Sequence, residues 1–389
     1  MKVKDKSTPK TILSEGGVKA IIWSDTFHLA ILMITLIILI VKGTIDAGGV
    51  GTVWNDNYNS GRIELFNFDP DPTIRHSFWT VFVGGTIYWT AICAVNQNAI
   101  QRFLSLPSMR DVYKTVWLAT AGKIIIYTLL FYIGMLIYST YKNCDPLASK
   151  MVKRTDQLLP LYVLDEMGTW AGFPGTLVAS VFSASIGAVA TMLNGMTAVT
   201  VRDFVQGMLR KKLTEVEAGT LSKFICLGFG LASLGFVFLV SQIGGLLQTA
   251  YSITGLVGGV GLGIYTLGVF FPWANWKGAL GGIICSFAFM IWVVWGAVMA
   301  SKDGYQSAHR KPISVENCLC NATLEVSQEP SEYILPIYKV SYLWYTGMSM
   351  TLSIIVGIII SGLTVFQDPR ELDHALISPI AKLFFILVI

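Results

Sequence analysis

TIYWTAICAVNQNAIQRFL, residues 86–104, begins as an apolar run and ends in a cluster of amides and an arginine. The apolar part suits a helix inside a membrane, and the polar part suits the place where that helix leaves the bilayer. A second stretch, VFSASIGAVATMLNGMTAVT at residues 181–200, is apolar and rich in small residues. Small residues let membrane helices pack closely. The two stretches together predict a membrane protein with a packed helical interior.

The composition extends this prediction to the whole chain. Of the 389 residues, 53% are hydrophobic and 13% are charged. A spanning helix takes roughly 20 mostly apolar residues, and about eight windows provide them. We therefore expect an all-α, polytopic membrane protein with a single membrane domain over residues 1–389. The windows are residues 18–42, 77–97, 115–139, 174–200, 222–242, 246–272, 279–300 and 340–365.

Basic residues predict the orientation, because cytosolic loops are enriched in lysine and arginine. Three basic segments fall on one side of a chain that crosses the membrane eight times, so that side is expected to be cytosolic. We therefore expect the N-terminal segment 1–17 and the tail 366–389 in the cytosol, with transmembrane helices over 18–365. The basic segments are residues 2–10, 102–114 and 202–212.

The opposite loops have features of an external surface. Asn321 begins an Asn-Ala-Thr sequon, which predicts N-glycosylation. Cys144, Cys318 and Cys320 lie in these loops, where an oxidising environment allows disulfides. Since three is an odd number, we expect Cys144 to pair with one of the other two and the third to stay unpaired or pair elsewhere. The expected external loops are residues 44–75, 141–172 and 302–338.

Residues suited to catalysis or metal binding are not grouped in any apolar window. The chain has four histidines, and its sequence shows no paired carboxylates within a window, no Ser/His/Asp set and no phosphate loop. We therefore expect no enzyme activity, no catalytic residue, no metal centre and no cofactor. The net charge of +4 gives no support for a nucleic-acid partner. Membrane lipids are the partners that the composition predicts.

Three polar residues within or beside the windows are candidates for function. Lys123 either extends its ammonium group to the inner interface or lines a polar cavity that would suit an anionic solute. Asp25 is on its own a carboxylate favoured by the positive end of a helix dipole, and Tyr251 is on its own an interfacial tyrosine. The window of Tyr251 repeats glycine every fourth residue from Gly255 to Gly263. This spacing predicts close approach by a neighbouring helix.

Several segments, taken in order, resemble the sodium/solute symporter family and together cover nearly the whole chain. VNQNAIQR at 95–102 and FFPWANWKGAL at 270–280 look most like the branch that carries monocarboxylates, vitamins and iodide. The segments are GGVKAIIWSDTFH (16–28), RHSFWTVFVGG (75–85), VNQNAIQRFLS (95–105), DQLLPLYVLDEMG (156–168), the helix centred on Asn194 through VTVRDFV, and TLGVFFPWANWKGAL (266–280).

The resemblance implies an inverted repeat of five plus five core helices, with one extra helix before it and further helices after it. The first window resembles the fifth core helix, windows two to six resemble core helices six to ten, and the last two are trailing helices. The extra first helix and core helices one to four have no counterpart, so we expect a partial form of this fold.

The resemblance also assigns residues to a solute site. Trp89, Ile92 and Cys93 fall where the family's sixth core helix faces the solute. Lys123 falls on a lysine that sugar-carrying members use at the solute site, and Tyr251 falls on a solute-contacting position. The resemblance therefore implies five substrate-binding residues.

The sodium site is where the chain departs from the family. The family holds sodium with backbone carbonyls and with two adjacent hydroxyls on the eighth core helix. The hydroxyl positions are Gly187 and Ala188 in this chain, and the carbonyl position is Ala184. Asp25 matches a carboxylate on the family's sodium exit route. Because Gly187 and Ala188 bring no side-chain oxygen, we expect a degenerate sodium site.

The resemblance implies a multi-pass, transporter-like protein of the plasma membrane. Its substrates are expected to be small organic anions such as monocarboxylates or vitamins, moved by alternating-access symport with sodium as the candidate coupling ion. The alternative is a truncated or diverged family member that does not transport and acts as a binding or regulatory membrane protein. Such a protein is expected to form a homo-oligomer, or a hetero-oligomer with a full-length relative.

Overall fold

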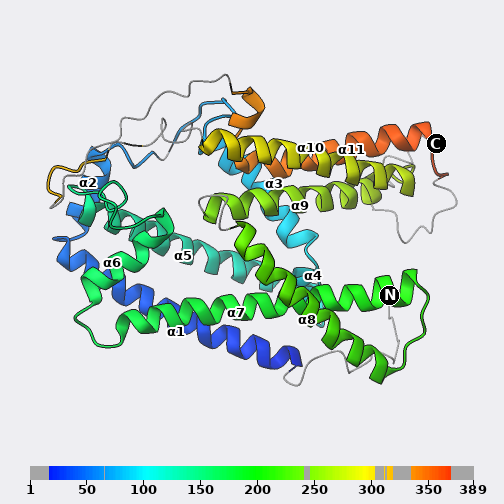
Figure 1. The fold of residues 1–389 in the computed structure, drawn as a ribbon, viewed down its shortest axis with the longest axis horizontal. Helices are drawn as coiled ribbons and strands as arrows, with labels where there is room; N and C mark the ends of the chain where they lie inside the picture. The colour runs from blue at the N-terminus through cyan, green and yellow to red at the C-terminus, as the bar shows by residue number, and fades with distance from the viewer. Residues whose placement is uncertain are drawn as a thin grey trace. The chain divides into compact units, whose positions relative to one another are not determined.

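The computed structural model describes residues 17–64, 66–240, 246–302, 311, 313–318 and 334–368. Every regular element in these ranges is a helix, which confirms the all-α prediction (Figure 1). The long helices are α1 (Gly17–Asp46), α5 (Met109–Tyr141), α7 (Phe173–Val199), α8 (Glu215–Val240), α9 (Leu246–Phe270), α10 (Trp276–Lys302) and α11 (Tyr345–Leu363). The shorter ones are α2 (Val50–Asn59), α3 (Gly85–Ala94), α4 (Gln97–Leu104) and α6 (Leu158–Met167). π-Helical turns occupy Thr80–Gly84 and Thr200–Met208, and short 3-10 turns occupy Thr155–Gln157, Pro336–Lys339 and Tyr342–Trp344.

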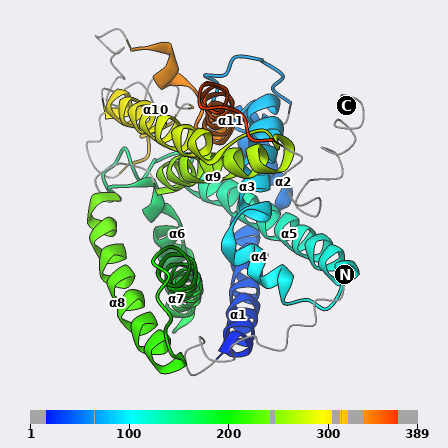
Figure 2. The same ribbon diagram turned by 90° about the vertical axis from the view of Figure 1, so that its right-hand side faces the viewer.

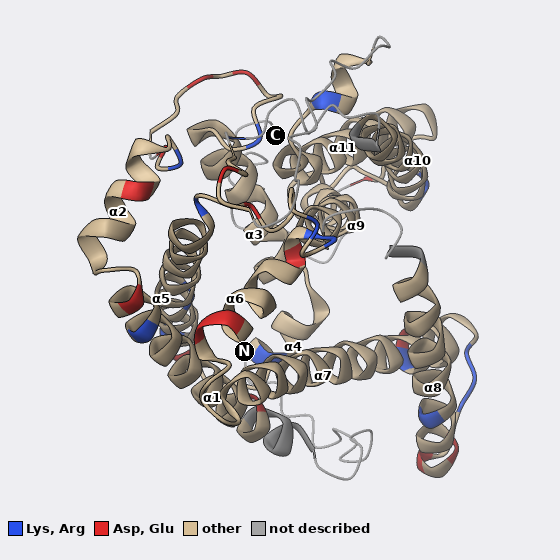
Figure 3. Ribbon diagram, turned by 60° about the vertical axis from the view of Figure 1, so that its left-hand side comes forward, with Lys and Arg blue, Asp and Glu red and all other residues tan. Residues whose placement is uncertain are grey.

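Seven helical stretches among the described residues are long and apolar enough to cross a membrane. The second expected window instead forms a shorter apolar helix over Thr80–Ala94. Charged residues lie mostly at helix ends and in connecting loops, as a membrane interior requires (Figure 3). The architecture is therefore that of a polytopic membrane protein, as predicted. The seven stretches are Trp23–Asp46, Met109–Tyr141, Phe173–Met208, Glu215–Phe238, Leu246–Phe270, Trp276–Ala300 and Tyr342–Leu363.

The amide cluster that follows the second window is a break between two helices. α3 ends at Ala94, and Asn96 adopts an extended conformation before α4 begins at Gln97. The Asn96 side chain accepts a hydrogen bond from the backbone N–H of Asn98 at 2.9 Å. An asparagine at this place satisfies a backbone donor that the first turn of a helix leaves without a partner. The polar end of the stretch 86–104 is thus a helix cap.

Contacts divide the chain into two compact units. Unit 1 contains α1, α2, α5, α6, α7 and α8, and unit 2 contains α3, α4, α9, α10 and α11. The expectation of a single membrane domain stays a prediction. Unit 1 is Met1–Arg62, Leu106–Gln242 and Ile313–Leu324, and unit 2 is Ile63–Ser105, Ile243–Pro312 and Glu325–Ile389.

In unit 1, side chains from several helices meet in one apolar cluster. Leu39 of α1, Leu136 of α5 and Tyr162 of α6 are fully buried there. Val53 and Leu177 bring α2 and α7 into the same cluster. Burial of such side chains stabilises a fold by about 1.5–3 kcal/mol each, so the cluster holds α1 beside α7.

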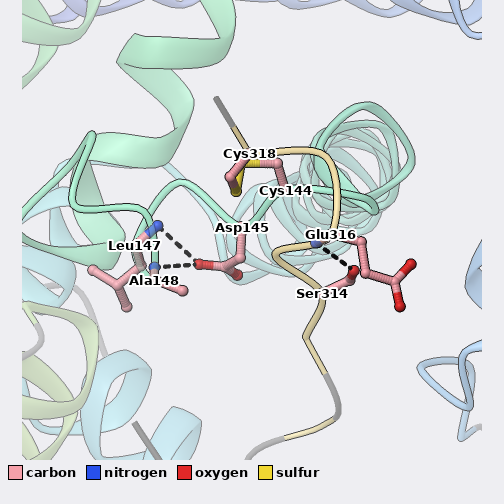
Figure 4. The surroundings of a disulfide bond; sticks show 7 residues. All are labelled: Cys144, Asp145, Leu147, Ala148, Ser314, Glu316 and Cys318. Carbon is pink, nitrogen blue, oxygen red and sulfur yellow. Dashed lines mark hydrogen bonds between the residues drawn. A yellow bond between two sulfur atoms is a disulfide. The ribbon is translucent and has the colours of Figure 1, made fainter. Parts of the chain in front are cut away.

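A disulfide joins the segment after α5 to a distant part of unit 1. Cys144 is bonded to Cys318 across a sequence separation of 174 residues (Figure 4). Backbone hydrogen bonds run beside it, from Asp145 N to Ser314 O at 2.9 Å and from Asn317 N to Asn143 O at 3.2 Å. The expected pairing partner of Cys144 is therefore Cys318 in this structure. Cys320, the other candidate, lies outside the described residues.

In unit 2, α9, α10 and α11 run side by side (Figure 2). Glycines allow this packing, as the four-residue spacing predicted: a methyl group on Gly259 would overlap Thr346 O and lie 2.7 Å from Ser349 Cβ, both on α11. Hydroxyls then cross between helices, since Ser349 Oγ donates to Leu256 O at 2.9 Å and Ser286 Oγ donates to Ser349 O at 2.9 Å. α3 packs on this group of helices.

Candidate functional site

The predicted solute residues belong to both units. Trp89, Ile92 and Cys93 lie on α3 and Tyr251 lies on α9, all in unit 2. Lys123 lies half-buried on α5 in unit 1. The residues on α3 and Tyr251 therefore belong to one compact unit, and Lys123 belongs to the other.

One side of α3, with the segment before it, lines an open cavity of about 730 Å³. Phe78, Phe82, Trp89 and Cys93 are among its walls. Their spacing of roughly one or two helical turns places them on one face of a helix that continues from the π-helical turn into α3. Two of the predicted solute residues, Trp89 and Cys93, therefore face a space large enough for a small molecule.

Ile92 and Tyr251 are not among the residues that line this cavity. Tyr251 stacks on Tyr88, with ring centroids 4.8 Å apart, and contacts Tyr342 at 5.7 Å. Tyr88 is buried, and its ring meets Trp89 edge-on at 5.8 Å. Tyr251 thus packs against α3 through Tyr88 and does not line the cavity itself.

The polar end of the cavity is formed by residues that precede the helix. Glu64, Asn67, His76 and Ser77 line it. Ser77 is buried and fixed, because its backbone N–H donates to Thr80 Oγ1 at 2.7 Å. These residues were not among the sequence candidates. The segment RHSF at 75–78 could have indicated them, because a cation and a histidine directly precede an apolar window there.

His76 is held at this end by a hydrogen bond between its Nε2 and the Tyr342 hydroxyl at 3.1 Å. Its pKa is lowered, first because burial disfavours the charged ring and second because the Arg75 guanidinium is close. Arg75 lies over the Tyr342 ring, 5.5 Å from its centroid. Glu64 pairs with Lys311 at the rim. Among the described residues, the polar end therefore contains one carboxylate, which already has a lysine partner, and one titratable imidazole.

The ion-site candidates lie in unit 1, where α1 and α7 are packed together. Ala184, Gly187 and Ala188 are on α7, and Asp25 is on α1. A methyl group built on Gly187 would lie 2.7 Å from Asp25 Oδ1, closer than such atoms approach each other in proteins. The Asp25 carboxylate therefore occupies the space that a side chain at position 187 would take.

Neighbouring hydroxyls on α7 are bonded within their own helix. Ser185 Oγ donates to Val181 O at 2.8 Å, and Thr191 Oγ1 donates to Gly187 O at 2.9 Å. Such bonds are usual for serine and threonine in helices. The Asp25 carboxylate is therefore the acidic oxygen source that the structure places against position 187.

Some predicted features lie outside the described residues. These are the sequon at Asn321, most of the basic N-terminal segment and most of the C-terminal tail. Glycosylation at Asn321 and the cytosolic position of both termini stay predictions.

Comparisons with known proteins agree with the architecture. The family model for the sodium:solute symporter family matches residues 11–286. The chain is 34% identical over 374 residues to the human sodium-coupled monocarboxylate transporter 2, covering 95% of this chain and 60% of that protein. It is 34% identical to the mouse sodium-coupled monocarboxylate transporter 1, with 92% and 62% covered. It is 31% identical to a putative sodium-dependent multivitamin transporter of Drosophila melanogaster, with 94% and 64% covered.

A solved structure has a similar fold. It is the substrate-bound, outward-open state of a Na⁺-coupled sialic acid symporter, with a TM-score of 0.62 and 18% sequence identity. The match covers 91% of this chain and 64% of that one. The chain thus spans about 60% of the length of these two monocarboxylate transporters. The family model covers well over half of the chain. The chain belongs to the sodium:solute symporter family.

Proposed function

We propose that this chain carries out sodium-coupled transport of small organic anions, such as monocarboxylates or vitamins, across the plasma membrane by alternating access. The observation that carries the proposal is the cavity beside α3, because Trp89 and Cys93, both assigned to the solute by family resemblance, line it. The names of the monocarboxylate and multivitamin relatives support this solute class. The basic segments at 2–10, 102–114 and 202–212 support a cytosolic position for both termini.

The cavity chemistry suits a solute with an apolar body and one anionic end. Phe78, Phe82 and Trp89 offer aromatic surface for the body. His76 and Asn67 offer groups that can donate hydrogen bonds at the polar end. A volume of about 730 Å³ lies within the range of small-molecule sites. A monocarboxylate is the simplest solute that uses both ends.

For the coupling ion, we propose that the Asp25 carboxylate supplies oxygen to sodium in place of the two hydroxyls that the family has on the helix corresponding to α7. Sodium is a co-substrate here, and it needs several oxygen atoms in place of its hydration shell. Asp25 Oδ1 already lies in the space beside Gly187. The backbone carbonyl of Ala184 is the second oxygen that the resemblance assigns to this place. A carboxylate brings a full negative charge, which strengthens cation binding in a poorly solvated site.

Radiolabelled benzoate uptake into cells that express the full chain tests the proposal. Sodium in the medium is replaced by choline in a parallel arm. We expect uptake above that of untransfected cells, stimulated by sodium, with loss of the stimulation in Asp25→Asn. Asp203→Asn, at an exposed position on the helical stretch Phe173–Met208 that also contains Gly187, is the matched control and should keep the stimulation. Sodium-stimulated uptake that is unchanged in Asp25→Asn would remove Asp25 from the ion site.

A second candidate is a solute-binding or regulatory membrane protein that does not transport, acting as a homo-oligomer or with a relative from its family. The observation that favours it is the lack of any side-chain oxygen at Gly187 and Ala188. Saturable benzoate binding by the purified chain, with no uptake in either sodium or choline, would favour this candidate over the first.

A further inference from the structure

We infer that His76, at the polar end of the cavity beside α3, receives the carboxylate of the solute, so that anion binding strengthens as the pH falls. This inference rests on the proposed function, because it assumes that the cavity is the solute site. It names a residue in the segment before α3, whereas the family resemblance assigned the solute to residues on the helices.

The charge of the cavity lining favours an anion at this end. Among the described residues that line the cavity, His76 is the one side chain that can become positive, and Glu64 is the one acidic side chain. Glu64 forms an ion pair with Lys311, so its charge is offset at the rim. An anion that enters the cavity therefore meets an imidazole rather than an uncompensated carboxylate.

The imidazole of His76 is held in place by Tyr342. Nε2 is engaged with the Tyr342 hydroxyl at 3.1 Å, and Tyr342 is itself buried. The His76 ring also meets the Tyr342 ring edge-on at 6.2 Å. A ring fixed by one nitrogen can use the other as a donor once it is protonated. Little side-chain entropy then remains to be lost when an anion binds.

Aromatic contacts link the partner of His76 to the rest of the site. Tyr342 contacts Tyr251, which stacks on Tyr88, and Tyr88 meets Trp89. A continuous series of aromatic contacts therefore connects Tyr342, the partner of His76, to Trp89 on the cavity wall. This series also explains how Tyr251, which does not line the cavity, could affect the solute.

The charges around His76 set the sign of the pH dependence. Partial burial, and after it the nearby Arg75 guanidinium, favour the neutral ring and hold the pKa of His76 below the ordinary value of about 6.5. Glu64, with its partner Lys311, lies at the same end of the cavity. A bound carboxylate favours the charged ring and raises the pKa again. Binding of an anion is therefore accompanied by proton uptake, so affinity rises as the pH falls through the titration range of His76.

The test is equilibrium binding of radiolabelled benzoate to the purified full chain at pH 7.5 and pH 5.5. We expect the unaltered chain to bind roughly tenfold more tightly at the lower pH, because the bound carboxylate favours the protonated imidazole. His76→Gln should bind weakly at both values, and His76→Lys, which stays charged, should bind tightly at both. His28→Gln, on α1 in unit 1, is the matched control and should behave like the unaltered chain.

Benzamide, which lacks the charge, should not compete with benzoate at either pH. The inference is overturned if His76→Gln keeps the pH dependence of the unaltered chain, or if the unaltered chain shows no saturable binding. Failure of the proposed function looks different, because benzoate would then bind with the expected pH dependence while no uptake into cells is seen.

Discussion

The α3 face in unit 2 and the α7 face in unit 1 are both assigned to ligands by family resemblance, yet they are built differently. The α3 face borders open space, with large side chains such as Phe82 and Trp89 around it. On α7, the space beside Gly187 is filled by the carboxylate of Asp25. The two proposed sites therefore differ in what they need. The proposed solute site needs an open, mostly apolar wall, whereas the proposed ion site needs a few oxygen atoms, one of which would come from a different helix, α1.

The largest expected effect comes from disturbing the helices behind α3. In Gly259→Ala, the new methyl group would overlap the backbone carbonyl of Thr346 and approach Ser349 Cβ, and backbone cannot easily move aside. We expect a loss of about 1–3 kcal/mol in the free energy of unfolding of the purified chain. Gly258→Ala is the control, because its methyl group would make an ordinary contact at 3.5 Å with Ala91. Equal stability of the two variants would contradict the packing described for unit 2.

A second change acts on the cavity alone. Trp89→Ala removes an aromatic wall from the α3 face and should weaken benzoate binding by about 2 kcal/mol, or roughly 30-fold, as expected for a central aromatic contact. Equilibrium binding to the purified chain measures it. Trp117→Ala, at an exposed position on α5, removes the same side chain away from the cavity and should leave affinity unchanged. If both variants bind benzoate equally well, the α3 face is not the solute site.

The helices were predictable because membrane helices need long apolar runs. Such runs can be recognised in the sequence without knowing which helices pack against each other. The break at Asn96 was less visible, since the same amides also suit a helix end at a membrane surface. The glycine spacing in α9 was informative because close packing leaves small residues at fixed intervals. What periodicity could not supply was the division of the contacts into two units.

The polar end of the cavity could not be predicted, for a physical reason. His76 is positioned by Tyr342, which is 266 residues away in the sequence. Nothing local to RHSF indicates that partner. Likewise, the sequence shows only that Gly187 brings no side-chain oxygen. The packing of α1 against α7 is what shows that the Asp25 carboxylate lies beside Gly187.

A smaller effect is expected for a substitution at Gly187 on the α7 face. Gly187→Ala should displace the Asp25 carboxylate, but this is the end of a side chain that can rotate away. We therefore expect a loss of about 1 kcal/mol or less in the free energy of unfolding. In the Asp25→Ala background the same change should cost nothing, so a double-mutant cycle isolates the contact. Additive effects would show that the two residues do not meet.

The smallest effect lies outside both faces, in the contact between α2 and α5. Burial raises the pKa of Asp56, but hydrogen bonds from Lys142 and Ser139 outweigh it and hold the pKa below its ordinary value. The stabilisation is present above the unfolded pKa of about 3.9 and is lost as the pH falls through the lower, folded pKa. Asp56→Asn should cost about 1 kcal/mol or less at pH 7. Denaturant unfolding at pH 7 and pH 3 should show the difference from the unaltered chain shrinking in acid, and a pH-independent difference would exclude the ion pair as its cause.

Protection of Cys93 is the most direct test that the α3 face holds the solute. Cys93 is exposed and lines the cavity, whereas Cys285 is exposed on α10 and is not among the residues that line it. The rate of alkylation of each thiol in the purified chain is measured by peptide mass spectrometry with and without saturating benzoate. We predict that benzoate slows alkylation of Cys93 and leaves Cys285 unchanged. Equal rates at Cys93 with and without benzoate, under conditions where benzoate binding is saturated, would contradict the account.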